Sequence, residues 1–185
     1  MAGTLSVQKI QGLASATDPT TVTIPSGHKL VASDTAGVIC PGQILQVVNT
    51  NFASNTGPFN TSANSYVQIT GLDTTITPKA SGSHILCTVN VMHGQNSNGW
   101  MHGELRRDGT QVAEQSWYGK DQYGGGIDCK PWFNFVDTTS GTTAGTAIAY
   151  TVWIHTQGST TVTVNWNNNN SNLSTSNVTL MEIAQ

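Results

Sequence analysis

Gly99–Tyr118 reads GWMHGELRRDGTQVAEQSWY, and this stretch decides the fold. Two runs of alternating residues flank the dipeptide Asp108-Gly109, whose readiness for positive φ is typical of a tight β-hairpin turn. Alternation along the first arm places successive side chains on opposite sides of a strand. One side carries Trp100, His102, Glu104 and Arg106, and the other carries Met101, Leu105 and Arg107. Because an isolated hairpin is barely stable in water, further strands must lie beside it.

Strand-like segments occur on both sides of this hairpin. The clearest is His84–Met92, whose alternate residues Ile85, Cys87, Val89 and Val91 point inward. The other predicted strands are Thr20–Ile24, Lys29–Ala32, Gln43–Asn49, Tyr66–Thr70, Thr74–Pro78, Pro131–Asp137, Ala147–Thr156, Thr160–Trp166 and Asn177–Ala184. No segment shows the 3.6-residue period of a long helix. Short strands separated by turn residues predict an all-β protein, a jelly-roll β-sandwich.

Polar, turn-rich stretches predict the loops and the domain boundary. Loops are expected at Phe52–Ser65, Tyr118–Asp128, Thr138–Gly145 and Asn167–Ser176. The first of these is the best boundary. We therefore predict an N-terminal attachment segment over residues 1–55, an extended arm plus short strands, and a jelly-roll domain over residues 56–185. The arm carries the apolar residues Leu5, Val7, Ile10 and Leu13, which we expect to bury against a capsid or a neighbouring subunit.

Composition excludes several partners. Charged residues make up 9% of the 185 residues, the net charge is −3, and seven scattered cations form no basic patch, so we expect no nucleic-acid partner. No apolar run approaches the ~20 residues of a membrane-spanning helix, and the N-terminus lacks the features of a signal peptide. The three cysteines are predicted to be reduced thiols, with a Cys87–Cys129 bridge as the alternative. We expect a protein made and assembled in a cytosol.

Catalytic signatures are missing from the sequence. There is no G-x-S-x-G elbow, no Walker loop and no G-x-G-x-x-G fingerprint. The five histidines form no cluster with metal-ligand spacing, although His102 and Glu104 project from one strand face. Glu104 and Glu114 are expected to sit across the hairpin from one another, as the two carboxylates of a glycosidase do, yet Arg106 and Arg107 offer them ion-pair partners. We therefore expect no catalytic residues, no cofactor, no bound metal and no enzymatic activity.

Aromatic residues supply the main alternative function. Trp100, Trp117 and Tyr123 lie in or just after the hairpin, and exposed aromatic rings stack on sugars and also anchor protein interfaces. They are candidate ligand-facing residues. Packing in the core or between subunits is the competing interpretation, and we prefer it.

Several strands carry apolar side chains on both faces. Leu86 and Met92 alternate with Ile85 and Val89, and Trp153 follows Val152. One face lines the core of the domain, and the other needs a cover. Identical subunits are the simplest cover, so we expect a cyclic homotrimer.

Three segments point to a family. LSVQKIQGL at residues 5–13, TVTIPSGH at residues 21–28 and NVTLMEIAQ at residues 177–185 resemble small virion structural proteins of tailed bacteriophages. The resemblance implies a trimeric jelly roll of the tumour-necrosis-factor or C1q type on an N-terminal attachment segment. Members of this kind either decorate or cement the capsid, or form the host-binding end of a fibre.

The sequence shows no repeats, no heptads and no shaft, which favours a capsid decoration or cement protein over a fibre. The partners implied are further copies of the chain and the major capsid protein or other virion proteins, with a host surface glycan under the fibre alternative. The location implied is the virion, assembled in the host cytoplasm.

Overall fold

The computed structural model describes residues 26–28, 38–54, 56–59, 65–95, 99–119, 126–138, 141–157, 161–165 and 175–185, with backbone alone at 56–59, 95, 117–119 and 126–131. The chain divides into two compact units, Met1–Asp34 and Thr35–Gln185. The account below concerns the second unit. None of the described residues forms a helix long and apolar enough to cross a bilayer.

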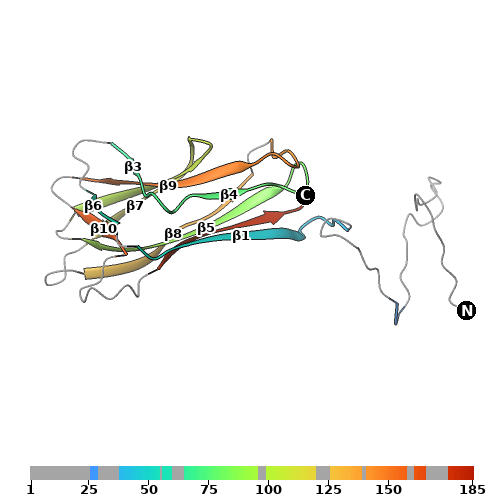
Figure 1. The fold of residues 1–185 in the computed structure, drawn as a ribbon, viewed down its shortest axis with the longest axis horizontal. Coiled ribbons are helices and arrows are strands. Elements are labelled where there is room, and N and C mark those ends of the chain that lie inside the picture. Colours follow the sequence, from blue (N-terminus) through green and yellow to red (C-terminus); the bar gives the residue numbers. More distant parts are fainter. Residues whose placement is uncertain are drawn as a thin grey trace, which may run out of the picture. The chain divides into compact units, whose positions relative to one another are not determined.

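Eleven strands make up the regular structure of the described residues (Figure 1). They are β1 (Ile44–Phe52), β2 (Thr56–Phe59), β3 (Val67–Gln68), β4 (Thr74–Ile76), β5 (His84–Gln95), β6 (Gly99–Arg107), β7 (Thr110–Gly119), β8 (Gly126–Asp137), β9 (Ile148–Thr156), β10 (Val162–Val164) and β11 (Ser176–Ile183).

The strands form two antiparallel sheets that lie as two layers (Figure 1). Sheet A has the order β1-β11-β5-β8, and β10 pairs with the far end of β5 and carries β2. Sheet B has the order β9-β6-β7, with β3 and β4 both paired to the outer edge of β9. The chain passes repeatedly between the sheets, because β1, β5 and β8 lie in one while β4, β6 and β9 lie in the other. The predicted all-β, jelly-roll sandwich is confirmed.

The core lies between the two sheets and follows the alternation of the sequence. Ile85, Cys87, Val89 and Val91 of β5 are all fully buried, as predicted. Sheet B faces them with Met101, Leu105, Tyr150, Val152 and Ile154. At ~25 cal/mol per Å2 of apolar surface, burial of these side chains is the main stabilising contribution.

The hairpin turn is confirmed at Asp108-Gly109. Both residues have positive φ, 47° and 83° respectively, as a two-residue type I′ turn requires. Asp108 also holds the start of β9, since its Oδ1 accepts a hydrogen bond from the Ala149 amide at 2.9 Å and its own amide donates to the Ala149 carbonyl at 2.8 Å. The turn is thereby fixed to the neighbouring strand of sheet B.

Three segments differ from the sequence prediction. Thr56–Phe59, predicted as loop, forms β2 because β10 offers it a pairing edge. Gly126–Asp128, also predicted as loop, opens β8, since β5 extends to Gln95 and pairs with it. Gln43–Asn49 was assigned to the attachment segment, whereas Ile44–Phe52 is β1 and pairs with β11 along its length. The attachment role of residues 1–55 stays a prediction, and Thr20–Ile24 and Lys29–Ala32 lie outside the described residues.

The cysteines at Cys40 and Cys87 are free thiols, one exposed and one buried. The strand register places Cys129 opposite Met92, five residues along β5 from Cys87. At ~3.3 Å per residue this offset far exceeds the reach of a disulfide, so the Cys87–Cys129 bridge does not form. Burial raises the pKa of the Cys87 thiol to about 12, which makes it a small apolar core residue, as expected.

One carboxylate is buried beneath the loop between β4 and β5. Glu182 of β11 is fully buried and accepts hydrogen bonds from the Lys79 and Ala80 amides and the Ser83 hydroxyl at 2.8–3.0 Å. The Gln46 amide donates a further one at 2.6 Å. Burial raises the pKa of Glu182, but these hydrogen bonds outweigh it and hold the pKa below its ordinary value. The carboxylate therefore ties this loop to both β11 and β1.

Candidate functional site

The outer face of sheet A carries a row of apolar side chains that crosses four strands. Val47 of β1 lies opposite Met181 of β11, Met181 lies opposite Leu86 of β5, and Leu86 lies opposite Val136 of β8. Val47 is 54% exposed and Val136 is 42% exposed. Directly opposed residues on antiparallel strands have touching side chains, so the four form one continuous strip.

Uncharged polar rows lie on one side of this apolar row, while the paired residues Ile44, Ile183 and His84 lie on the other. Thr179 and Thr88 are paired in the next row, and the Asn49 amide donates to the Thr179 hydroxyl at 2.7 Å. In the row beyond, the Asn90 amide donates to the Asn177 carbonyl oxygen at 3.1 Å. These rows are ordered by hydrogen bonds within the face.

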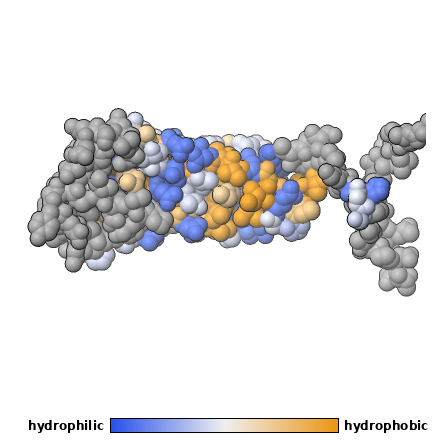
Figure 2. All heavy atoms as spheres, turned by 90° about the horizontal axis from the view of Figure 1, so that it is seen from below, coloured by the Kyte–Doolittle hydropathy of each residue, from blue (hydrophilic) through white to orange (hydrophobic). Residues whose placement is uncertain are grey.

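The described part of this face contains no Asp, Glu, Lys or Arg side chain. Its outward residues are Ile44, Val47, Asn49, Asn51, Asn177, Thr179, Met181, Ile183, His84, Leu86, Thr88, Asn90, Met92, Asn134 and Val136. Figure 2 shows the side of the molecule that lies below in Figure 1, with hydrophobic residues gathered in its middle. An apolar strip bordered on one side by Thr and Asn side chains, on a face whose described residues include no Asp, Glu, Lys or Arg, has the composition of a protein interface.

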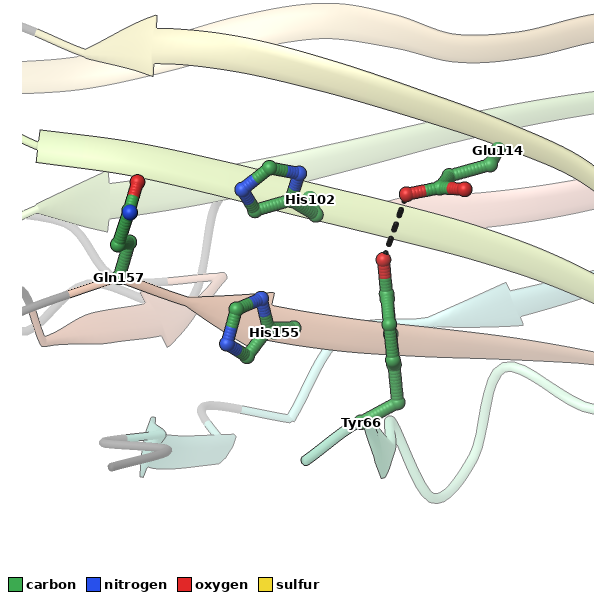
Figure 3. A pocket seen from close by; sticks show the side chains of 5 residues that line it. All are labelled: Tyr66, His102, Glu114, His155 and Gln157. Atoms are coloured by element: carbon green, nitrogen blue, oxygen red, sulfur yellow. Dashed lines mark hydrogen bonds between the residues drawn. The ribbon is translucent and has the colours of Figure 1, made fainter. Parts of the chain in front are cut away.

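The outer face of sheet B is different, because it holds an open pocket of about 270 Å3. Five residues line it: Tyr66, His102, Glu114, His155 and Gln157. His102 lies on β6, Glu114 on β7 and His155 on β9, while Tyr66 precedes β3 and Gln157 follows β9. In Figure 3 the two imidazoles lie between Gln157 at one end and the Tyr66–Glu114 pair at the other.

Tyr66 and Glu114 close one end of the pocket. The Tyr66 hydroxyl donates to Glu114 Oε1 at 2.8 Å, and Gln111 Nε2 donates to Glu114 Oε2 at 3.1 Å. Burial raises the pKa of Tyr66, and the bond to Glu114 raises it further, so the phenol stays protonated. Its ring lies 5.4 Å from the His155 ring, centroid to centroid, and forms an aromatic wall.

The two histidines are neighbours across β6 and β9. Their ring centroids lie 5.1 Å apart, and His102 Nδ1 lies 2.7 Å from the Ser116 hydroxyl oxygen. Burial and the adjacent His102 lower the pKa of His155, against the opposing effect of Glu104 and Glu114. His155 is therefore a neutral imidazole at pH 7, with one nitrogen that donates and one that accepts.

The positive charge nearest this pocket is already engaged. Arg106 forms an ion pair with Glu104, with Nη2 and Oε2 2.6 Å apart. Its guanidinium also lies 4.0 Å above the Trp153 ring, a cation–π geometry. Among the described residues, no three His, Cys, Asp or Glu side chains are arranged to hold a metal ion.

The structure locates only part of the predicted site. Trp100 lies on the outer face of sheet B and is 46% exposed. Its carbonyl accepts a hydrogen bond from the Gln157 amide at 3.0 Å, which puts it beside the pocket. Trp117 has its backbone on β7 opposite Met101, with its side chain outside the described set. Tyr123, Leu5, Val7, Ile10 and Leu13 all lie outside the described residues.

Sequence reasoning did not find the pocket itself. The sequence paired His102 and Glu114 each with Glu104 and not with one another, and it indicated no role for Tyr66, His155 and Gln157. In the sequence, His102 and Glu114 share a hairpin, whereas Tyr66 and His155 lie far from that hairpin on either side. The pairing of β6 with β9 brings these pieces together.

No protein-family model matches the chain, and no curated protein sequence does. Among solved structures, the chain is similar to the "Structure of infectious bursal disease virus Gt strain", with a TM-score of 0.41 and 15% sequence identity. The similarity covers 91% of this chain and 43% of that one. The chain thus spans less than half the length of that structural neighbour.

Proposed function

We propose that this chain is a non-enzymatic structural protein of a bacteriophage virion, a homotrimeric capsid decoration or cement protein. Three copies associate through the outer faces of their A sheets. The N-terminal segment of residues 1–55 docks each copy on the major capsid protein or another virion protein. The phage assignment and the trimer follow the resemblance of the terminal segments described above.

The observation that carries this proposal is the row Val47–Met181–Leu86–Val136. It joins four strands into one apolar strip, and the described side chains around it include no Asp, Glu, Lys or Arg. Covering an apolar surface of this kind with a matching surface removes it from water, which is favourable. In a cyclic trimer the A sheets of three copies face a common axis, and the strip of each copy contacts the strips of its two neighbours.

Charge placed in the row tests the self-association. We expect Met181→Asp and Leu86→Asp to sediment as monomers, because an unpaired carboxylate in a buried interface is strongly unfavourable. Gln115→Asp, at an exposed position of sheet B, is the matched control and keeps the trimer. A wild-type chain that sediments as a monomer at all accessible concentrations contradicts the proposal.

The docking role has its own experiment. Removal of residues 1–20 deletes Leu5, Val7, Ile10 and Leu13 and leaves every described strand intact. We expect the shortened protein to remain folded and trimeric and to lose binding to capsids. Cosedimentation with purified capsids, beside the full chain, measures this, and retained binding refutes the docking role.

A further inference from the structure

In addition to the proposed role as a capsid decoration or cement protein, we propose that the pocket on sheet B binds a single neutral, hydroxyl-rich sugar residue, free or at the end of a glycan. The residues that bind it are Tyr66, His102, Glu114, His155 and Gln157. Trp100 flanks the pocket as an exposed ring. Five of these six residues differ from those that the sequence singled out as ligand-facing.

Size is the first argument. The cavity of about 270 Å3 lies near the lower end of the ~300–1,000 Å3 range of small-molecule pockets, a size that suits one six-membered ring with its substituents. Its mouth is open, since Glu114 and Gln157 are exposed. The remaining sugars of a longer glycan can therefore extend through the mouth into solvent and need no further cavity.

The hydrogen-bonding groups are the second argument. A sugar hydroxyl both donates and accepts, so its site needs groups of both kinds. The neutral imidazole of His155 and the amide of Gln157 each supply a donor and an acceptor, and Glu114 accepts. These groups come from both ends and the middle of the pocket (Figure 3), which matches hydroxyls distributed around a ring.

Aromatic surface is the third argument. The Tyr66 ring lines the pocket at 5.4 Å from the His155 ring, and Trp100, 46% exposed, lies two residues before His102 on the same face of β6. The apolar C–H face of a sugar packs on such rings, which carry a negative π face. The site thus offers hydrogen-bonding groups for the hydroxyls of a pyranose and aromatic rings for its apolar C–H face.

Charge excludes the rival ligands. An anion meets Glu114 in the pocket and Glu104 nearby, while Arg106, the adjacent cation, is paired with Glu104 at 2.6 Å. A cation finds one carboxylate, Glu114, among the lining residues, and the charge of that carboxylate is already shared by hydrogen bonds from the Tyr66 hydroxyl and the Gln111 amide. A neutral polar ligand avoids both penalties.

Titration of the isotope-labelled full-length protein by NMR tests the site. The probes are glucose, galactose and N-acetylglucosamine, each as the free sugar and as the methyl glycoside. Inorganic phosphate and tetramethylammonium serve as the anionic and cationic comparisons. We expect saturable shifts of the His102, His155 and Gln157 resonances with at least one of the sugars and none with either ion.

Variants assign those shifts to the pocket. Gln157→Ala and Trp100→Ala change exposed side chains, and we expect them to weaken sugar binding about tenfold, the loss of one hydrogen bond or ring contact. Gln115→Ala, exposed beside Glu114 but not lining the pocket, leaves binding unchanged. Equal binding of a sugar and its methyl glycoside supports a chain-terminal sugar, and preference for the free sugar supports a monosaccharide ligand.

Three results overturn the proposal. They are the absence of saturable shifts with all of the sugars, stronger binding of phosphate or tetramethylammonium, and sugar binding that survives both variants. The Met181→Asp protein is titrated in parallel. Sugar binding retained by a monomer separates this site from the proposed association of sheet A.

Discussion

The hydroxyl of Tyr150, on β9 of sheet B, donates a 2.6 Å hydrogen bond to the carboxylate of Asp137, on β8 of sheet A. The same carboxylate oxygen lies 3.3 Å from Arg107 Nη1 of β6. Tyr150 is fully buried and Asp137 nearly so. Asp137 is therefore a polar link between the two layers, and burial together with this bond raises the pKa of Tyr150.

Tyr150→Phe should destabilise the fold by about 1–3 kcal/mol. The substitution keeps the ring and removes the donor, so the buried Asp137 loses one of its partners and retains Arg107. Urea denaturation followed by tryptophan fluorescence measures the free energy of unfolding. Tyr66→Phe, which removes the more exposed bond to Glu114, is the control and should cost less. If Tyr150→Phe and Tyr66→Phe lower the free energy of unfolding equally, the buried hydrogen bond to Asp137 contributes no more than an exposed one.

Glu182 should make the protein sensitive to acid. Its pKa is depressed in the folded state, so its carboxylate stabilises the fold above the unfolded pKa of about 4.5. That contribution is lost as the pH falls from there through the lower, folded pKa. Glu182→Gln should lower stability at pH 7 and flatten the fall below pH ~4.5. Denaturation midpoints of both proteins over this pH range measure the effect. If the midpoint of Glu182→Gln falls with pH as steeply as that of the wild type, Glu182 is not the source of the acid sensitivity.

His155 should add a second pH dependence at milder acidity. Its pKa lies below the ordinary 6.5 in the folded state, so between 6.5 and the folded value the unfolded chain binds a proton that the folded chain does not. Stability therefore falls as the pH drops through this window. His155→Gln should remove that part of the slope, whereas His84→Gln on sheet A should keep it. Thermal unfolding at a series of pH values between about 7 and 5 measures both.

Gly71 should not tolerate a side chain. Its φ is +100°, and a Cβ there would lie 2.5 Å from two ring carbons of Phe52. Gly71→Ala combines backbone strain with a clash and should cost about 2 kcal/mol or more. Gly82→Ala is the matched control, because Gly82 has φ +79° with nothing within 4 Å of the added atom. The difference between the two, from chemical denaturation, isolates the contact with Phe52.

Local patterns predicted the hairpin and most strands, because turn geometry and alternation act over a few residues. The two-residue turn alone would place Glu104 opposite Ala113, and a β-bulge between Leu105 and Arg106 shifts the register by one residue, so that Glu104 lies opposite Glu114. β2 escaped prediction because Thr56–Phe59 contains a Gly-Pro pair and no alternation. Its strand geometry depends on β10, more than 100 residues further along.

The two candidate surfaces were predictable to different degrees. The apolar outer side of Leu86 and Met92 indicated that sheet A needs a cover. Nothing local indicated that Val47 and Val136 continue the row, because that depends on the pairing of β1 with β11 and of β8 with β5. The pocket depends likewise on the pairing of β9 with β6. Long-range register is the information that a single sequence lacks.

The neutrality of the outer face of sheet A determines how the proposed assembly responds to its surroundings. Contacts made without ionised groups are indifferent to ionic strength, since there is no Coulombic attraction for counterions to screen. They depend on the hydrophobic effect of burying apolar side chains, which weakens on cooling and strengthens with sulfate. Trimers built on the Val47–Met181–Leu86–Val136 row should thus persist at both low and high ionic strength and should dissociate on cooling.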